Sequence, residues 1–204
     1  MALKAANDKS MSNITALPAG VSAKSLILLA TETASSSATI SFTSDIDSTY
    51  NEYQFHYINV HAGNDDVALT FQVDTGTNTS YNQNVTNTYS AARHNEADAT
   101  PNVGYWTNRD LANSTSFVRL NYDTGNQTTD ECLSGILHLY EPSSSTFVKH
   151  FLATTNDSGY TSSGAAQQSF IGGYFNTTTA LTRVQFKMTG GNIDAGTFKM
   201  YGVV

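Results

Sequence analysis

The sequence has little charge, a single cysteine and no long apolar run. Asp, Glu, Lys and Arg form 13% of its 204 residues, about half their share in an average globular domain. The ten basic residues are scattered and the formal net charge is −7, which argues against a nucleic-acid partner because phosphate binding needs clustered Lys and Arg. Cys132 stands alone, so an intrachain disulfide framework is excluded. The longest apolar run, residues 26–30, is too short for a membrane span of roughly 20 residues.

Neutral polar and aromatic residues take the place of charge. Ser, Thr and Asn together number 68, and Tyr and Phe together number 21. The chain has the length of about one domain and enough bulky apolar side chains for a sizeable core. Composition therefore indicates a folded domain whose surface is rich in hydroxyls and amides.

Apolar residues alternate with polar ones at the period of a β-strand. Val67, Leu69, Phe71 and Val73 form one such run, and the alternation predicts a strand with one buried face. The other predicted strands are 26–31, 38–43, 53–57, 115–122, 133–140, 146–154, 168–174, 181–188 and 196–203. Turn-rich stretches separate them, at 61–66, where a hairpin is expected, and at 123–126, 142–145, 156–159 and 189–192. The pattern predicts an all-β fold, an antiparallel β-sandwich that is jelly-roll-like, over residues 21–204.

The first 20 residues do not fit the sandwich pattern. They carry isolated apolar side chains among polar ones, which predicts an N-terminal extended arm whose anchors dock on the chain's own sandwich or on a neighbouring subunit. The candidate inter-subunit residues of this arm are Leu3, Met11, Ile14, Leu17 and Pro18.

A second irregular segment, His94–Ser114, is predicted to be a long excursion between strands. Long ordered loops often carry binding sites. Its candidate ligand- or partner-binding residues are Tyr105, Trp106 and Arg109, with Asn102, Asn108 and Asp110 nearby. The alternative interpretation is that Tyr105 and Trp106 only close the end of the sandwich.

No motif predicts catalysis, a metal site or a cofactor. The chain lacks a Gly-x-Ser-x-Gly elbow and a phosphate-binding Gly-rich loop. None of its five histidines has the His-x-x-x-His spacing of a helical zinc site. The adjacent acids Asp65-Asp66 and Asp130-Glu131 lie in turn-like contexts, where solvation explains them. We therefore expect a protein that is not an enzyme, with no cofactor and no metal.

Three stretches carry a resemblance to a known family. They are Ala5–Ser10 leading to Asn13–Pro18, then Phe42–Tyr53, and finally Gly190–Val203, whose Tyr-Gly-Val ending is the most specific part. Together they resemble structural proteins of tailed bacteriophages of marine bacteria, such as cyanophages and pelagiphages. The resemblance covers most of the chain and brings no catalytic residues with it.

The resemblance implies a virion component that is assembled in the host cytoplasm. Residues 1–10 lack the apolar stretch of a secretory signal, which agrees with that expectation. The leading hypothesis is a capsid decoration (cement) protein that contacts the major capsid protein and neighbouring copies of itself, as a homotrimer. The alternative is a receptor- or glycan-binding module of a tail or head fibre, which would bind a host-surface glycan at Tyr105 and Trp106.

Overall fold

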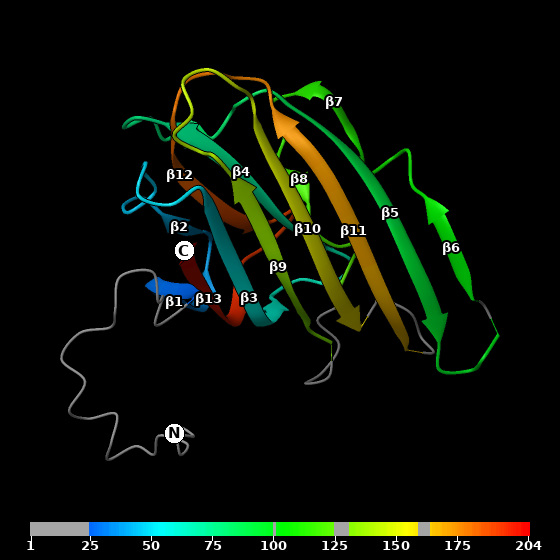
Figure 1. Ribbon diagram of the computed structural model, residues 1–204. Helices are drawn as coiled ribbons and strands as arrows, with labels where there is room; N and C mark the ends of the chain where they lie inside the picture. The colour runs from blue at the N-terminus through cyan, green and yellow to red at the C-terminus, as the bar shows by residue number, and fades with distance from the viewer. Residues whose placement is uncertain (1–24, 100, 125–130, 159–163) are drawn as a thin grey trace, which may run out of the picture.

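All regular secondary structure in the described residues is β-strand (Figure 1). The computed structural model describes residues 25–99, 101–124, 131–158 and 164–204. Within these ranges no helix could cross a membrane. The strands are β1 (Leu26–Ser37), β2 (Ile40–Phe42), β3 (Glu52–Ala62), β4 (Leu69–Thr75), β5 (Val85–Asn95), β6 (Asn102–Tyr105), β7 (Leu111–Ser114), β8 (Val118–Arg119), β9 (Leu133–Tyr140), β10 (Lys149–Ser158), β11 (Ala165–Phe175), β12 (Leu181–Met188) and β13 (Ile193–Val203).

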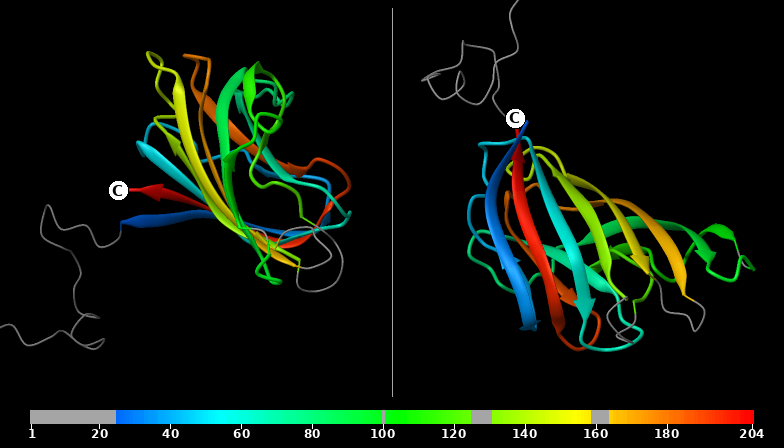
Figure 2. Two further views of the ribbon diagram at one scale, coloured as in Figure 1. Left: turned by 90° about the vertical axis from the view of Figure 1, so that its right-hand side faces the viewer. Right: turned by 90° about the horizontal axis from the view of Figure 1, so that it is seen from below.

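The strands form two antiparallel sheets of unequal width. The nine-stranded sheet has the order β1-β13-β3-β9-β10-β11-β5-β6, with β7 also paired to β5. The four-stranded sheet has the order β2-β12-β4-β8, and the wider sheet curves around it (Figure 1, Figure 2). The chain passes several times from one sheet to the other, while β9, β10 and β11 follow one another within the wide sheet. The predicted antiparallel β-sandwich is confirmed.

Aromatic side chains fill the space between the sheets. The ring of Phe186, on β12, lies 5.3–6.4 Å from the rings of five other residues, measured between centroids. These five are Phe42, Phe55, Tyr57, Phe71 and Phe198, and all are buried. The alternation in residues 53–57 predicted the burial of Tyr53, Phe55 and Tyr57, which point into the sandwich from β3.

Four local predictions from the sequence are wrong. The run 67–73 was expected to have one solvated face, but β4 is buried on both faces. Residues 61–66 do not close a hairpin, because β3 lies in the nine-stranded sheet and β4 in the four-stranded sheet. The stretch predicted as a turn at 156–159 begins with the last residues of β10. The predicted strand 115–122 is reduced to the two residues of β8. In addition, the 11-residue strand β5 was missed.

The two ends of the described core lie side by side. The backbone N–H of Val204 donates to the carbonyl of Ser25 at 3.1 Å, and β1 and β13 are paired along their length. The predicted arm, with Leu3, Met11, Ile14, Leu17 and Pro18, lies outside the described residues.

Candidate functional site

The inward face of three neighbouring strands changes from apolar to polar along its length. On β10, Phe151 and Ala153 are followed by Thr155 and Asp157, and all four are buried. On β11 the same change runs from Ile171 to Ser169 and Gln167, and on β5 from Tyr89 to Arg93 and Asn95. One end of this inward face is therefore lined with polar groups and its middle is apolar, while Lys149 and Asn87 are buried toward the other end.

Strand register brings three of these polar side chains into one row. Asp157 of β10 pairs with Gln167 of β11, and Gln167 pairs with Arg93 of β5. Directly paired residues on adjacent strands point to the same face of a sheet. Arg93, Gln167 and Asp157 therefore lie beside one another on the inward face.

A pocket of about 320 Å³ adjoins two members of this row, Arg93 and Gln167, and Asp157 does not line it. It is called the Arg93 pocket here, and it is lined by Arg93, Asn102, Trp106, Tyr122 and Gln167. Its lining combines one cation, two amides and two aromatic rings. Pockets of this size, with aromatic walls and a few polar groups, are typical of small-molecule sites.

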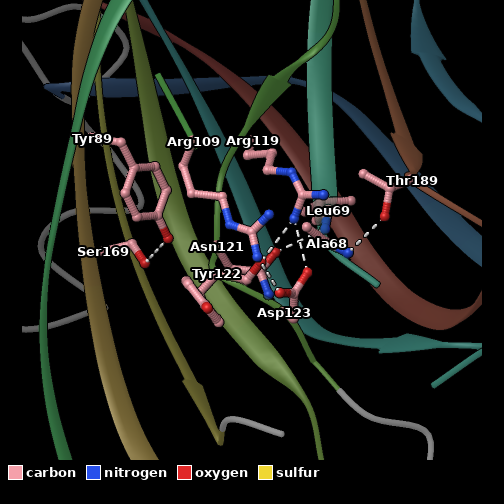
Figure 3. Close-up of polar contacts among 10 residues, drawn as sticks. All are labelled: Ala68, Leu69, Tyr89, Arg109, Arg119, Asn121, Tyr122, Asp123, Ser169 and Thr189. Atoms are coloured by element: carbon pink, nitrogen blue, oxygen red, sulfur yellow. Dashed lines mark hydrogen bonds and ion pairs between the residues drawn. The ribbon is translucent and has the colours of Figure 1, made fainter. Parts of the chain in front are cut away.

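Two arginines and one aspartate form an ion-pair network (Figure 3), which adjoins the pocket through Tyr122. Arg109 Nη2 lies 2.6 Å from Asp123 Oδ2, and Arg119 Nη1 lies 2.8 Å from Asp123 Oδ1. Burial raises the pKa of the Asp123 carboxyl, and the hydrogen bond from Arg119 and the charge of Arg109 oppose that rise. The network also fixes Tyr122, whose ring lies 4.4 Å from the Arg109 guanidinium carbon and meets Trp106 edge-on.

Two tyrosine hydroxyls reach the polar end of the interior. Tyr89 shares a 2.6 Å hydrogen bond with Ser169, shown in Figure 3, and Tyr57 shares a 2.5 Å hydrogen bond with Thr155. Burial raises the pKa of both phenols, so each stays neutral and can donate or accept a hydrogen bond.

Asp157 is the most perturbed carboxyl group in the described residues. It is 1% exposed, and neither carboxyl oxygen has a hydrogen-bond partner within the described part of the chain. Burial, reinforced by the charge of Asp123, raises the pKa of Asp157 to about 8, and the charge of Arg93 opposes the rise. A buried carboxyl without a partner favours its neutral form, so at neutral pH the group is mainly a carboxylic acid that can donate a hydrogen bond.

The structure separates the three candidate residues of the His94–Ser114 segment. Trp106 lines the pocket and also packs against the core, so it both closes the end of the sandwich and faces the site. Arg109 pairs with Asp123 and lies against the ring of Tyr122, which lines the pocket. Tyr105 is half exposed at the end of β6, donates to Asp110 at 2.5 Å and does not line the pocket. Asn102 lines the pocket, whereas Asn108 does not.

Sequence reasoning missed Arg93, Gln167 and Asp157. Asp157 stood in a stretch with the composition of a turn, and Gln167 preceded the predicted start of its strand. Arg93 lies on β5, whose alternation is hidden because Asn87, Arg93 and Asn95 occupy inward positions. A buried polar face produces no hydrophobic period, so only the strand pairing brings these residues together.

The site contains hydrogen-bond donors and aromatic surfaces without metal-ligand geometry. Among the described residues, no three His, Cys, Asp or Glu side chains gather in a way that could hold a metal ion. No protein-family model, curated protein or solved structure matches the chain. The arrangement is chemically suited to binding a small polar molecule through donated hydrogen bonds and ring contacts.

Proposed function

We propose that the protein is a non-enzymatic structural component of a phage virion, a capsid decoration protein that stabilises the head through contacts between subunits. The observation that carries this proposal is the outer face of the nine-stranded sheet. The described residues place no further layer of structure over this face, and it displays apolar side chains to solvent. Leu152 of β10 is 54% exposed, and Phe170 of β11 is 45% exposed.

Strand register groups these side chains into one surface. Phe170 pairs with Thr154, which pairs with Ile136, while Leu152 pairs with His138 in the next outward row. Apolar side chains exposed together on a broad sheet mark a contact surface more often than side chains exposed singly. A sheet face that meets the capsid or a neighbouring copy would bury these residues.

The predicted arm supplies the second contact of the proposal. Burial of Leu3, Ile14 and Leu17 between subunits would contribute about 1.5–3 kcal/mol for each fully buried side chain. Repetition of the contact around a closed, symmetric assembly would multiply that gain. The resemblance to phage structural proteins supports the same role.

The copy number per particle tests the virion role. Quantitative mass spectrometry of purified virions should find this chain at a number comparable to that of the major capsid protein. A count of a few copies would assign the protein to the tail or a unique vertex, and absence from the particle would overturn the proposal.

Variants of the outer face test the contact surface. Leu152→Asp combined with Phe170→Asp should abolish binding of the purified protein to particles that lack it, because charged groups cannot be buried there without partners. Thr178→Asp is the matched control, since Thr178 is exposed in the turn between β11 and β12. If the double variant binds as well as the control, the outer face is not the contact surface.

The Arg93 pocket favours a second candidate, a glycan-binding module. Sugars stack on aromatic faces and accept hydrogen bonds from amides and guanidinium groups, and the pocket offers Trp106, Asn102 and Arg93. A glycan array with wild type and Trp106→Ala should show binding that the substitution removes. Unchanged binding by Trp106→Ala would place any glycan site elsewhere.

A further inference from the structure

Positive charge is concentrated at the Arg93 pocket, although the chain as a whole is acidic. The sequence has four arginines and a formal net charge of −7, and three of the arginines, Arg93, Arg109 and Arg119, lie at this end of the sandwich. Arg109 and Arg119 share one carboxylate, that of Asp123. Arg93 makes no ion pair with any described residue. With Asp157 neutral, the site carries an excess of positive charge.

The same site holds buried hydrogen-bonding groups that the described residues do not satisfy. Gln167 is 3% exposed and lines the pocket, yet its Nε2 has no partner in the described chain. Both carboxyl oxygens of its cross-strand neighbour Asp157 also lack a hydrogen-bond partner in the described chain. A buried polar group without a hydrogen bond destabilises the fold. In folded proteins such groups are completed by ordered water, by an ion or by a bound molecule.

The unpaired groups are predominantly donors. At the pocket, Arg93 donates from its guanidinium group and Gln167 from Nε2, while Asp157, the cross-strand neighbour of Gln167, adds no negative charge when it is protonated. Their shared need is an acceptor that carries negative charge, which a carboxylate supplies with two oxygens. The rings of Trp106 and Tyr122 form the remaining wall and suit the C–H face of a sugar ring.

We propose that the Arg93 pocket binds a carboxylate-bearing sugar, a uronic acid at the end of or within a glycan chain. The carboxylate accepts from Arg93 and Gln167, and the sugar ring lies against Trp106. The inference does not depend on the virion role. It rests on the second candidate function, glycan binding, and names the chemical class of the glycan.

Binding is expected to require the neutral form of Asp157. A second negative charge beside the bound carboxylate would repel it, and the charged groups that face Asp157 are Asp123 and Arg93. The phenols of Tyr57 and Tyr89 also face it, and they stay neutral throughout the relevant range because burial raises the pKa of both. The affinity should therefore fall as pH rises through the pKa of Asp157, which is about 8.

The protein carries its own probe for this experiment. Trp106 is the single tryptophan of the chain and lines the pocket, so its fluorescence reports occupancy directly. Titration with galacturonate at pH 6.5 should change the Trp106 emission, whereas galactose, which has the same ring without the carboxylate, should bind at least about tenfold more weakly, as expected for loss of a charge-assisted hydrogen bond.

Variants assign the interaction to named residues. Arg93→Gln should weaken galacturonate binding at least about tenfold, whereas Arg183→Gln, at the arginine outside the site, should leave the affinity within about twofold. Asn102→Ala removes an exposed amide of the pocket without altering the core, so it keeps the test valid if Arg93→Gln unfolds; it should weaken binding about threefold or more.

The pH dependence of galacturonate binding tests the role of Asp157 separately. Wild type should lose about tenfold in affinity between pH 6.5 and pH 9, because one pH unit above its pKa about a tenth of the groups remain protonated. Asp157→Asn, which keeps a neutral donor, should change by less than about twofold over the same range. An equal loss in both proteins would overturn the role of Asp157.

Four results would overturn the carboxylate-sugar assignment, and they differ in what they leave standing. Equal affinity for galactose and galacturonate leaves a glycan site with no selection for acid. If acetate binds as tightly as galacturonate, the sugar ring contributes nothing to recognition. If inorganic phosphate binds as tightly as galacturonate, the pocket is a general anion site. No binding by any of these probes overturns the inference and withdraws the support that the pocket gives to glycan binding.

Discussion

Replacing Asp157 by Asn should stabilise the protein at alkaline pH and leave its stability at acidic pH nearly unchanged. The carboxyl group is 1% exposed and has no hydrogen-bond partner in the described chain. Burial raises its pKa from the ordinary value of 3.8 to about 8. The folded protein therefore keeps a proton on Asp157 over a pH range in which the unfolded chain has lost it.

The sign of the pH dependence follows from proton binding. Between pH 4 and pH 8 the folded state binds one more proton at Asp157 than the unfolded state, so the free energy of unfolding falls as pH rises. Each pH unit in this window lowers it by about 1.36 kcal/mol, and the whole window corresponds to roughly 5 kcal/mol. Local opening that hydrates the carboxylate limits this loss, and we expect at least about 2 kcal/mol of it to be measurable. Below pH 4 Asp157 is protonated in both the folded and the unfolded state, so it no longer makes the free energy of unfolding depend on pH.

The measurement is urea unfolding of wild type and Asp157→Asn at pH 4.0 and pH 8.5. The variant should exceed wild type by at least about 2 kcal/mol at pH 8.5 and by less than about 0.5 kcal/mol at pH 4.0. Carboxyl groups that do not interact with Asp157 titrate equally in both proteins, so their effects cancel in the comparison; among the described residues, Asp123 is the one carboxyl whose charge acts on Asp157. Asp194→Asn, at an exposed position of β13, is the control and should show no such difference. The same gap at both pH values would refute the reasoning.

Three further substitutions test the core, the ion-pair network and a close backbone approach, each by the change in the free energy of unfolding. Phe186→Ala should lower the free energy of unfolding by about 3–5 kcal/mol, because its ring contacts five others in the core. The control Phe147→Ala, at a 72% exposed position, should change the free energy of unfolding by less than about 0.5 kcal/mol. Similar losses in the two variants would contradict the assigned core. Asp123→Asn should lower the free energy of unfolding by about 2–3 kcal/mol, since it leaves Arg109 and Arg119 without their carboxylate. The control Asp98→Asn, in the exposed pair with His94, should lower it by less than about 0.5 kcal/mol. An equally small loss at Asp123 would show that the ion-pair network does not stabilise the fold. Gly173→Ala should lower the free energy of unfolding by about 3 kcal/mol or more, because a Cβ there would lie 2.5 Å from the carbonyl oxygen of Thr86. In the control Gly172→Ala the new Cβ meets only the flexible end of Leu152, at 3.1 Å, so the loss should be about 1 kcal/mol or less. Equal losses would contradict the close approach of Thr86 to Gly173 and would indicate that both glycines act through backbone conformation.

The sequence predicts strands well where hydrophobic alternation and burial agree. Tyr53, Phe55 and Tyr57 were predicted to share a buried face, and they do, on β3. The same reasoning failed at β5, because its inward positions include Asn87 and Arg93. A strand that faces a polar interior shows no apolar period, and periodicity is the signal on which the prediction depends.

The choice of partner strand is the second feature that the sequence does not predict. The turn-rich residues 61–66 suited a hairpin, but β3 and β4 belong to different sheets. Turn composition indicates that the chain reverses or bends and does not choose the partner strand. The Arg93 pocket depends on such a choice, because Asp157, Gln167 and Arg93 are neighbours only through the register of β10, β11 and β5. Of its lining residues, the sequence had singled out Trp106 and Asn102, both from the irregular segment between strands.

The hydrogen bond between Ser25 and Val204 makes the sandwich suitable for protein engineering. A short glycine-rich linker could join these two residues, and new termini could open in the turn that follows β9, at Ser143–Ser145, without breaking a paired strand. A guest domain fused after Val204 would leave from the β1–β13 edge of the wide sheet, whereas β5 and β6 lie at the opposite edge. Cargo attached there would leave the Arg93 pocket open to solvent, so the fold could serve as a display scaffold with two independently addressable sides.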